Sequence, residues 1–433
     1  MSSVFARGWN LPQAVAAAGC WVVDDTGRRY LDAAGGAVVS SVGHGRPEVI
    51  DAIARQLRAV DYVHATRFTT PILEEYAAAL STRVPVPAAR VYPVSGGSEA
   101  METALKLARS YHLARGEAHR TALVARAGSY HGNSLGALDV SGRVFLRAPY
   151  LPWLGRSVHL PAVYEYRCPA PNHPRACGRW HAGQLEALIV ERGDVAAFVA
   201  ESVGGATLGA VVPPDDYWRE VATVCRRHGV LLIVDEVMAG FGRTGRWFGI
   251  EHWGVQPDII VAGKGASSGY WPLGLCIASA GVHEVAGAVF VHGFTYSHHP
   301  AGAAAGLAVM EIIEEEGLVQ SAADKGGLLA ELLRRAFSAH PHVGDIRGKG
   351  LLVALEVVAD RATRLPFDRS EEVTARLITS CLEQGLIVYP AARGADGTNG
   401  DALLLGPPLS IAADELELVV ERLEAAITRT LGP

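Results

Sequence analysis

Residues 217–235 read YWREVATVCRRHGVLLIVD, and this stretch decides the fold class. Tyr217–His228 has the apolar spacing of an amphipathic helix, and Gly229 is placed to end that helix. The following run, Val230–Val234, is apolar without interruption. A continuous apolar strand, unlike an alternating one, is typical of a parallel sheet that is buried on both faces. The stretch therefore predicts one helix–strand unit of an α/β protein.

Further strands of the same kind lie on both sides of this unit. They are predicted at Arg90–Val94, Thr121–Arg126, Val195–Ala200 and Asp258–Ala262. A helix from Glu99 to about Arg115 follows the first of these strands, and Gly116 ends it. We expect a large α/β domain whose mostly parallel sheet is covered by helices.

The C-terminal part of the chain has a different pattern. A long helical stretch begins near Gly302 and continues past Glu316. Strands are predicted after it at Gly350–Val358, Leu386–Tyr389 and Ala402–Leu405, followed by a helix from Ala412 to about Leu431. These elements predict a second, smaller α+β domain. Residues 161–179 are interpreted as a surface insertion, and residues 391–400 as a glycine-rich loop.

The composition excludes several classes of protein. At 433 residues, with 49% hydrophobic and 19% charged side chains, the chain can bury a large core in two or three domains. A net charge of −6 argues against a dedicated binder of nucleic acid or of anionic membranes. No apolar run approaches the ~20 residues that span a bilayer. We expect a soluble cytoplasmic protein.

The cysteines do not predict a disulfide framework or a metal site. Six cysteines are too few for a disulfide scaffold in a chain of this length. Cys168 and Cys177 are the closest pair, and His173 and His181 lie near them in the sequence. Their spacing lacks the short Cys-x-x-Cys motif of structural zinc sites, so reduced thiols are the better interpretation.

Three short motifs follow predicted strands and carry possible chemistry. The first, Ser95-Gly96-Gly97-Ser98, stands between a strand and a helix, where backbone N–H groups and a hydroxyl can hold an anion. The second is Asp235, a carboxylate at a strand end. The third is Lys264, which stands between two glycines after an apolar strand and can become a Schiff-base amine if it is desolvated.

Each motif alone also has an ordinary structural interpretation, as a helix cap, a loop acid or a solvated lysine. Together they meet the needs of pyridoxal 5′-phosphate (PLP), which requires a phosphate site, an acid for its pyridine nitrogen and an amine for its aldehyde. Walker A and Gly-x-Gly-x-x-Gly motifs are missing, which excludes the nucleotide-binding enzymes that depend on them.

The motifs also resemble those of a known family. They are SGGSEAMETALKLAR, SYHG, LLIVDEVMAGFGRTG, PDIIVAGKG, GYWPLG and HGFTYSHHPAG, in this order. This series closely resembles the class III aminotransferases, which are PLP-dependent enzymes of fold type I, and the resemblance covers essentially the whole chain. It implies a large PLP-binding domain at 51–315 and a smaller domain built from residues 1–50 and 316–433.

The resemblance implies a role for each matching residue. Lys264 would form the Schiff base with PLP and move a proton between the donor Cα and C4′ of the cofactor, and Asp235 would keep the pyridine nitrogen protonated. Glu201 would lie near the 3-hydroxyl group. The remaining cofactor-binding residues would be Tyr130 and Val237 on the two faces of the ring, His131 beside Tyr130, and Gly97, Ser98 and a partner subunit's Thr295 at the phosphate. A shared site implies a homodimer or a dimer of dimers.

Four positions bear on the substrate. Arg393 is the candidate for an arginine that binds a substrate carboxylate, in a loop that matches the family loosely. His298 stands where the family pattern has glycine, and it either narrows the entrance or is a histidine at the rim. Glu201 precedes Ser202 where proline is common. No aromatic residue lies near Val38, where members that accept amines often have one, which argues against a bulky amine.

The resemblance implies ping-pong transamination (EC 2.6.1.-), from an amine or an ω-amino acid to a 2-oxo acid such as pyruvate. Aminomutases, amino-acid epimerases and decarboxylating aminotransferases share the scaffold and remain alternatives. A cofactor-free scaffold protein would not need Lys264, Asp235 and Tyr130 together.

Overall fold

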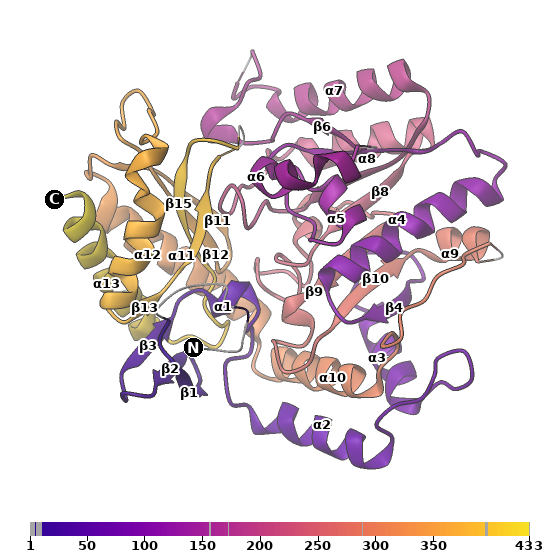
Figure 1. The fold of residues 1–433 in the computed structure, drawn as a ribbon, viewed down its shortest axis with the longest axis horizontal. Coiled ribbons are helices and arrows are strands. Elements are labelled where there is room, and N and C mark those ends of the chain that lie inside the picture. Colours follow the sequence, from indigo (N-terminus) through magenta and orange to yellow (C-terminus); the bar gives the residue numbers. More distant parts are fainter. Residues whose placement is uncertain are drawn as a thin grey trace.

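The computed structural model describes residues 5, 11–155, 157–171, 173–287, 289–394 and 397–432. Its centre is a seven-stranded sheet with the order β4-β10-β9-β8-β7-β5-β6 (Figure 1). These strands are β4 (Arg90–Val94), β5 (Ala122–Arg126), β6 (Ser157–Leu160), β7 (Val195–Glu201), β8 (Leu231–Asp235), β9 (Ile259–Gly263) and β10 (Gly274–Ala278). Strand β10 runs antiparallel to both of its neighbours, β4 and β9, and every other neighbouring pair is parallel. The prediction of a mostly parallel sheet is therefore confirmed.

Both faces of this sheet are buried, as the continuous apolar strands predict. Along β7, Ala197 and Val199 pack in one core with the helix α4 (Gly97–Ala114). Their neighbours Phe198 and Ala200 point to the opposite face, whose core includes residues of α7 (Cys177–Arg192) and α8 (Tyr217–His228). Successive side chains of a strand point to opposite faces of the sheet. A strand that is apolar at every position therefore gives both faces of the sheet an apolar surface.

Two smaller sheets flank the central one. The first, in the order β1-β2-β3-β13, joins β1 (Ala14–Ala18), β2 (Trp21–Asp24) and β3 (Arg29–Asp32) to β13 (Leu386–Ile387). The second, in the order β11-β12-β15-β14, contains β11 (Val343–Lys349), β12 (Leu352–Val357), β14 (Tyr389–Ala392) and β15 (Asp401–Leu405). The N-terminal segment therefore shares a sheet with a strand from the C-terminal part of the chain.

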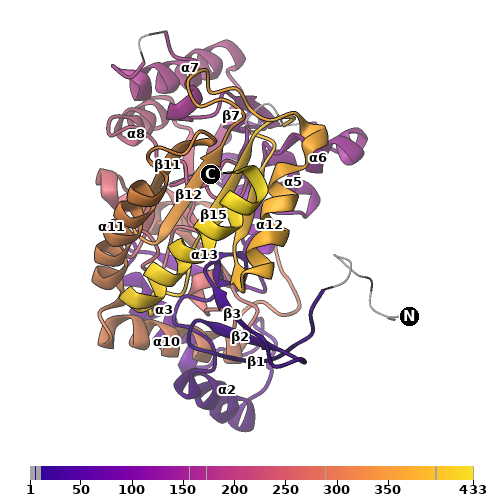
Figure 2. The ribbon, with the colours of Figure 1, turned by 90° about the vertical axis from the view of Figure 1, so that its left-hand side faces the viewer.

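Ten further α-helices lie in the described part of the chain. They are α1 (Gly35–Val38), α2 (Pro47–Ala59), α3 (Pro71–Ser81), α5 (Leu135–Val140), α6 (Val144–Arg147), α9 (Ala280–Ala286), α10 (Pro300–Glu315), α11 (Leu318–Phe337), α12 (Val373–Glu383) and α13 (Ala413–Leu431). Figure 2 shows α11, α12 and α13 packed beside the sheet of β11, β12 and β15.

Two predicted elements of the C-terminal part were wrong. The stretch predicted as one helix from Gly302 past Glu316 is two helices, because Gly317 adopts φ = 61° between α10 and α11. The strand predicted at Leu386–Tyr389 is two short strands, β13 and β14, which belong to different sheets.

The segment 161–179, interpreted as a surface insertion, is partly buried. Tyr164 is only 3% exposed, and its hydroxyl donates a hydrogen bond to Glu356 on β12. Arg167 lies 3.5 Å from the same carboxylate, so this segment bridges the central sheet and the C-terminal sheet.

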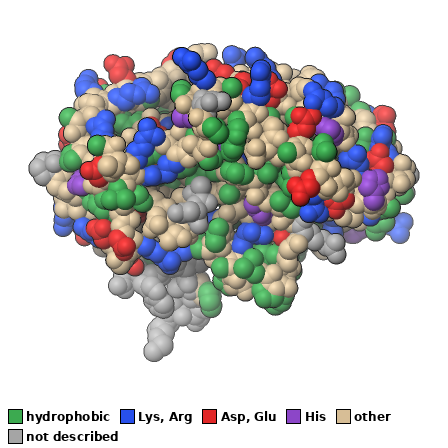
Figure 3. Space-filling model, turned by 90° about the horizontal axis from the view of Figure 1, so that it is seen from above, with side chains coloured by type: hydrophobic (Ala, Val, Ile, Leu, Met, Phe, Trp, Pro, Cys, Tyr) green, Lys and Arg blue, Asp and Glu red, His purple; other side chains and the backbone are tan. Residues whose placement is uncertain are grey.

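None of the helices in the described part of the chain is both long and apolar enough to span a bilayer. On the face shown in Figure 3, acidic and basic side chains are interspersed among hydrophobic ones.

Candidate active site

The three central strands place functional residues at one edge of the sheet. Glu201 ends β7, Asp235 ends β8, and Lys264 directly follows β9. These strands are parallel neighbours, and Glu201 is in register with Asp235. The carboxyl ends of parallel strands meet at the same edge, which is where ligands bind in open α/β sheets. The structure therefore brings Asp235 and Lys264 to one cavity.

Lys264 sits in a strained and poorly solvated position. Its backbone has φ = 48°, in the left-handed region that non-glycine residues rarely adopt. Burial lowers the pKa of its amine to about 8, while the negative charges of Asp235 and Glu201 oppose this decrease and Arg243 adds to it. A substantial fraction of the amine is consequently neutral near pH 8, as a nucleophile or a general base requires.

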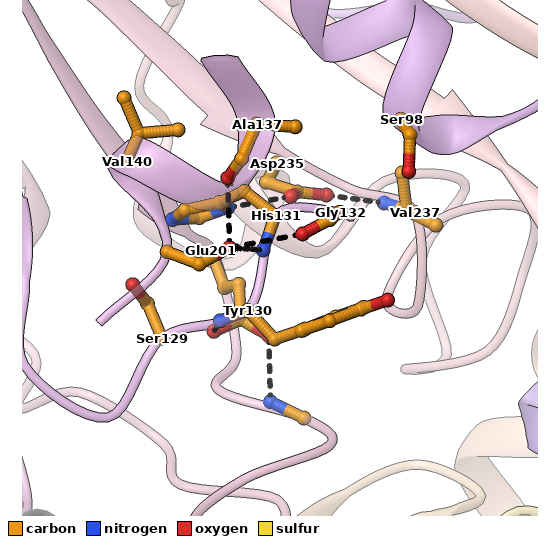
Figure 4. A network of polar contacts seen from close by, with 12 residues as sticks. Ser98, Ser129, Tyr130, His131, Gly132, Ala137, Val140, Glu201, Asp235 and Val237 are labelled. Atoms are coloured by element: carbon orange, nitrogen blue, oxygen red, sulfur yellow. Dashed lines mark hydrogen bonds and ion pairs between the residues drawn. The ribbon is translucent and has the colours of Figure 1, made fainter. Parts of the chain in front are cut away.

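Asp235 is held by two hydrogen bonds (Figure 4). His131 Nδ1 donates to Oδ2 at 2.7 Å, and the backbone N–H of Val237 donates to Oδ1 at 2.9 Å. Asp235 is 4% exposed and His131 is 3% exposed, so this pair is almost completely removed from water. The carboxylate therefore has a fixed orientation and can accept a further hydrogen bond from a ligand.

Glu201 is also held by the backbone. Its Oε1 accepts from the N–H of Gly205 at 3.0 Å, and its Oε2 accepts from the N–H of Tyr130 at 3.3 Å. Burial raises the pKa of Glu201 to about 7, with Asp235 adding to the increase and His131 opposing it. The carboxyl group can therefore exchange a proton near neutral pH.

The start of α4 forms an anion site opposite the lysine. Gly97 and Ser98 occupy the first turn, where helix N–H groups have no partner within the helix. A Cβ at Gly97 would lie 3.2 Å from both γ-carbons of Val237, so glycine allows this close approach. The hydroxyl of Ser98 accepts from the N–H of Asn133 at 3.1 Å, which ties α4 to the loop that carries His131.

These groups surround one cavity of about 160 Å³. It is lined by Gly97, Ser98, Tyr130, His131, Gly132, Glu201, Val203, Asp235, Val237, Met238 and Lys264. The donor set fits PLP, because an amine of lowered pKa, a fixed carboxylate and a helix N-terminus with a hydroxyl face the same space. The fold and the site together define a PLP-dependent enzyme of fold type I.

Comparison with known proteins identifies the family within this class. Residues 7–427 match the family model of the class III aminotransferases. The chain belongs to the class III aminotransferases, and it is accordingly a PLP-dependent aminotransferase (EC 2.6.1.-).

Three similar proteins illustrate the relationship. The uncharacterized aminotransferase YodT of Bacillus subtilis is 37% identical, over 93% of this chain and 92% of its own length. An (S)-enantioselective ω-transaminase from Thermomicrobium roseum superimposes with a TM-score of 0.92 at 37% identity, covering 97% of this chain and 93% of that one. An amine transaminase from an uncultivated Pseudomonas species, solved in its PLP-bound form, gives a TM-score of 0.91 at 36% identity, covering 99% and 97%.

Four of the predicted residues lie outside this cavity within the single chain. Val38 is buried against Gly406 and does not line it. Thr295 is exposed, and its carbonyl oxygen accepts a hydrogen bond from the Tyr62 hydroxyl at 3.0 Å. Arg393 places its guanidinium carbon 4.1 Å from the centroid of the Phe145 ring.

His298, the fourth of these residues, packs edge-on against Tyr92 with 4.6 Å between the ring centroids. Its backbone has φ = 61°, which explains in physical terms why a glycine is usual at this position. Burial lowers the pKa of His298, so its ring is neutral near pH 7.

Arg143 was not predicted from the sequence. Its guanidinium carbon lies 4.6 Å from the centroid of Phe145, on which Arg393 also packs. Burial lowers the pKa of Arg143, whereas the nearby Tyr130 and Glu201 raise it. Arg143 Nε is buried and has no hydrogen-bond partner among the described residues. Arg143 follows Ser141 and Gly142 and belongs to no recognisable motif. No local sequence pattern therefore indicates that it lies near the cavity.

Arg243 and Arg347 bind backbone carbonyl groups and a carboxylate of other parts of the chain. Arg243 is buried and donates to the carbonyl oxygens of Leu351, at 3.1 Å, and Pro407, at 2.5 Å. Arg347 donates to the carbonyl oxygen of Gly209 at 2.6 Å and to Glu356 at 2.9 Å.

Proposed function

We propose that the amino donor is an amine or an ω-amino acid, and that the acceptor is a 2-oxo acid such as pyruvate, in a ping-pong cycle. The observation that carries this proposal is the pair of guanidinium groups on Phe145. Neither Arg143 nor Arg393 forms an ion pair with a carboxylate in the part of the chain that the structure describes. A 2-oxo acid brings a carboxylate, which suits such a pair of arginines.

The residues of the cavity have separate tasks in this proposal. Lys264 Nζ would hold the aldehyde of the cofactor, and as a neutral amine beside the donor Cα it would serve as general base. Asp235 would supply a negative charge for the pyridine nitrogen, and His131 fixes the orientation of that carboxylate. The bound cofactor supplies an electron sink for the charge that develops at the donor Cα.

The other predicted residues position the cofactor. Gly97 and Ser98, at the start of α4, would receive its phosphate, and Tyr130 and Val237, which line the same cavity, would bound its ring. Glu201, with its raised pKa, stands near the 3-hydroxyl group and can share a proton with it. The preorganised groups stabilise charge without moving, because backbone N–H groups already hold both Glu201 and Asp235.

The site is completed by a second subunit in this proposal. Thr295 is exposed in the single chain, so its hydroxyl is accessible to the phosphate site of a partner subunit. Mixing Lys264→Ala with Thr295→Val chains tests the homodimer. If each site uses its own Lys264 and the partner's Thr295, hybrid dimers contain one intact site and regain activity.

Arginine substitutions test the acceptor. We expect Arg143→Leu and Arg393→Leu each to raise the KM for pyruvate by about 10- to 100-fold, the effect of losing a charged hydrogen bond of roughly 1.5–3 kcal/mol. The KM for isopropylamine, a small donor without a carboxylate, should stay unchanged. Arg179→Leu is the control, because Arg179 is exposed on α7. An unchanged KM for pyruvate in both variants contradicts the proposal.

The products separate transamination from its alternatives. A transaminase releases one carbonyl product per donor and one amino acid per acceptor. An aminomutase or an epimerase releases no carbonyl product, and a decarboxylating enzyme releases CO₂. Equal amounts of acetone and alanine, without CO₂, are expected from isopropylamine and pyruvate.

A further inference from the structure

A cluster of cysteine and histidine side chains lies where the segment 161–179 enters α7, and none of its residues lines the cavity. One donor atom each from Cys168, His173 and Cys177 lies within 4.8 Å of the others. Cys177 is the first residue of α7, which lies at the top of Figure 1, and His181 stands one helical turn further along the same face. The fold therefore gathers three mutually close donor atoms and places a fourth, His181 Nε2, beside Cys168.

The distances between the donor atoms suit a common ligand. Cys168 Sγ lies 2.9 Å from Cys177 Sγ and 3.6 Å from His181 Nε2. For tetrahedral zinc, bond lengths of ~2.3 Å to sulfur and ~2.1 Å to nitrogen require S···N of about 3.6 Å and S···S of about 3.8 Å. His181 Nε2 already stands at the required distance from Cys168 Sγ, and its ring must approach the other two donors. The sulfurs must separate by about 0.9 Å, which the half-exposed Cys168 in its loop permits.

The His181 imidazole is enclosed by protein at the start of α7. His181 is completely buried, and its Nδ1 has no hydrogen-bond partner among the described residues.

We propose that Cys168, His173, Cys177 and His181 bind one Zn²⁺ ion. Two thiolates and two imidazoles form a closed tetrahedral set, which is typical of structural zinc and leaves no open position for catalysis. Binding replaces the two thiol protons, which are released to solvent, and involves no change in oxidation state. A disulfide between the two cysteines would leave both imidazoles without a role.

The position of the cluster indicates what the metal stabilises. The segment that ends in Cys168 and His173 carries Tyr164 and Arg167, whose side chains contact Glu356 on β12. A metal ion would fasten the end of this segment to the start of α7. The bridge between the central and C-terminal sheets would then be anchored at both ends.

Metal analysis of the PLP-loaded enzyme tests this proposal. After incubation with zinc chloride and dialysis, elemental mass spectrometry should find about one zinc per chain in the wild type, in line with tight structural sites. Cys168→Ser and Cys177→Ser should lose at least ~10-fold in zinc affinity. Cys381→Ser is the matched control, because Cys381 is an equally buried thiol that belongs to no donor cluster among the described residues, and it should retain zinc.

A second variant guards against simple misfolding. His173 is exposed, so His173→Ala should keep the native circular dichroism spectrum while it lowers zinc affinity at least ~10-fold. A chelator should lower the Tm of the wild type and leave that of Cys168→Ser unchanged. Three results overturn the proposal: zinc retained in the double variant Cys168→Ser/Cys177→Ser, no zinc bound while both thiols are free, or a wild-type mass that reveals a disulfide.

Discussion

His131 Nδ1 lies 2.7 Å from Asp235 Oδ2, and this contact joins the loop after β5 to the end of β8. The other oxygen of Asp235 accepts from the N–H of Val237, so the carboxylate cannot rotate without losing a hydrogen bond. Because both side chains are buried, water does not replace a lost partner. The orientation of the charge that faces the cofactor therefore depends on His131 as much as on Asp235 itself.

Substitutions of His131 test this dependence. His131→Leu removes the donor, and we expect it to weaken PLP binding by about 10- to 100-fold, which corresponds to the ~1.5–3 kcal/mol of a charged hydrogen bond. His131→Asn keeps an N–H donor near the position of Nδ1 and should retain most of the affinity. Equilibrium dialysis of the cofactor-free protein against PLP measures both. An equal loss of PLP affinity in the two variants would mean that PLP binding does not depend on the hydrogen bond from residue 131 to Asp235.

The lowered pKa of Lys264 predicts a pH dependence for cofactor binding. Only the neutral amine attacks an aldehyde, so the rate at which the cofactor-free protein takes up PLP should increase with pH and level off above about pH 8. Stopped-flow absorbance measures this rate. An ordinary lysine would give a rate that continues to increase up to about pH 10.4, and that result would contradict the assigned burial.

Glu201→Gln should move this inflection to lower pH. The negative charge of Glu201 favours the protonated amine of Lys264, so removing that charge lowers the pKa of the lysine further. We expect a shift of roughly one pH unit, which is about 1.4 kcal/mol of lost interaction. Glu220→Gln on α8 is the control and should leave the inflection in place. An unchanged inflection would show that Glu201 is protonated, and therefore uncharged, in the free enzyme.

Turnover should depend on Lys264 alone among the lysines. Lys264→Ala removes both the amine that binds the cofactor and the proposed general base, so the rate should fall by more than ~10⁴-fold, beyond what acid–base catalysis alone contributes. Lys106→Ala, at an exposed position of α4, should have wild-type activity. Steady-state assays of both variants, with circular dichroism to confirm folding, provide the comparison. Wild-type turnover in Lys264→Ala would refute the assignment.

The sheet and the cavity could be predicted because their signals are local. Apolar runs ending in Glu201, Asp235 and Lys264 define parallel strands, and parallel strands bring their ends together. β8 and β9 begin and end one residue later than predicted, which leaves their functional residues at the sheet edge. The domain boundaries at residues 50 and 315 stay a prediction.

Other features depend on contacts that no local pattern encodes. His131 and Asp235 are 104 residues apart in sequence, so only the fold brings them together. The Cys168 cluster lacks a short-spaced cysteine pair, and the turn of α7 supplies the proximity that the spacing does not show. The break at Gly317 is likewise invisible, since a single glycine is tolerated inside many helices.

Gly132→Ala should disturb the phosphate side of the cavity. Gly132 has φ = 134°, and a Cβ there would lie 2.5 Å from Ser98 Oγ and 2.9 Å from Ala137 Cβ. The added methyl group must displace Ser98, so we expect PLP affinity to fall about 10-fold and stability to fall by roughly 1–3 kcal/mol. Gly183→Ala in α7 meets nothing within 4 Å and should be neutral or stabilising. Dialysis and thermal melts distinguish the two variants.

The buried ion pair between Arg347 and Glu356 should dominate the stability of the junction between the central sheet and the C-terminal sheet (β11, β12, β14 and β15). Their side chains lie 2.9 Å apart, Glu356 is 3% exposed, and Arg347 also binds the carbonyl oxygen of Gly209. Arg347→Met removes the nearer of the two cations at this buried carboxylate and leaves only Arg167 at 3.5 Å, so we expect a loss that approaches the ~3–5 kcal/mol of a broken buried pair. The double variant Arg347→Met/Glu356→Leu removes that charge as well and should recover much of the loss.

Urea denaturation measures this effect as a shift in the midpoint. Arg179→Met, which breaks an exposed pair with Glu220, is the matched control and should cost less than about 1 kcal/mol. If Arg347→Met shifts the midpoint no more than Arg179→Met does, the junction is held by its apolar contacts. If the double variant is less stable than Arg347→Met, Glu356 contributes through Tyr164 and Arg167 rather than through Arg347.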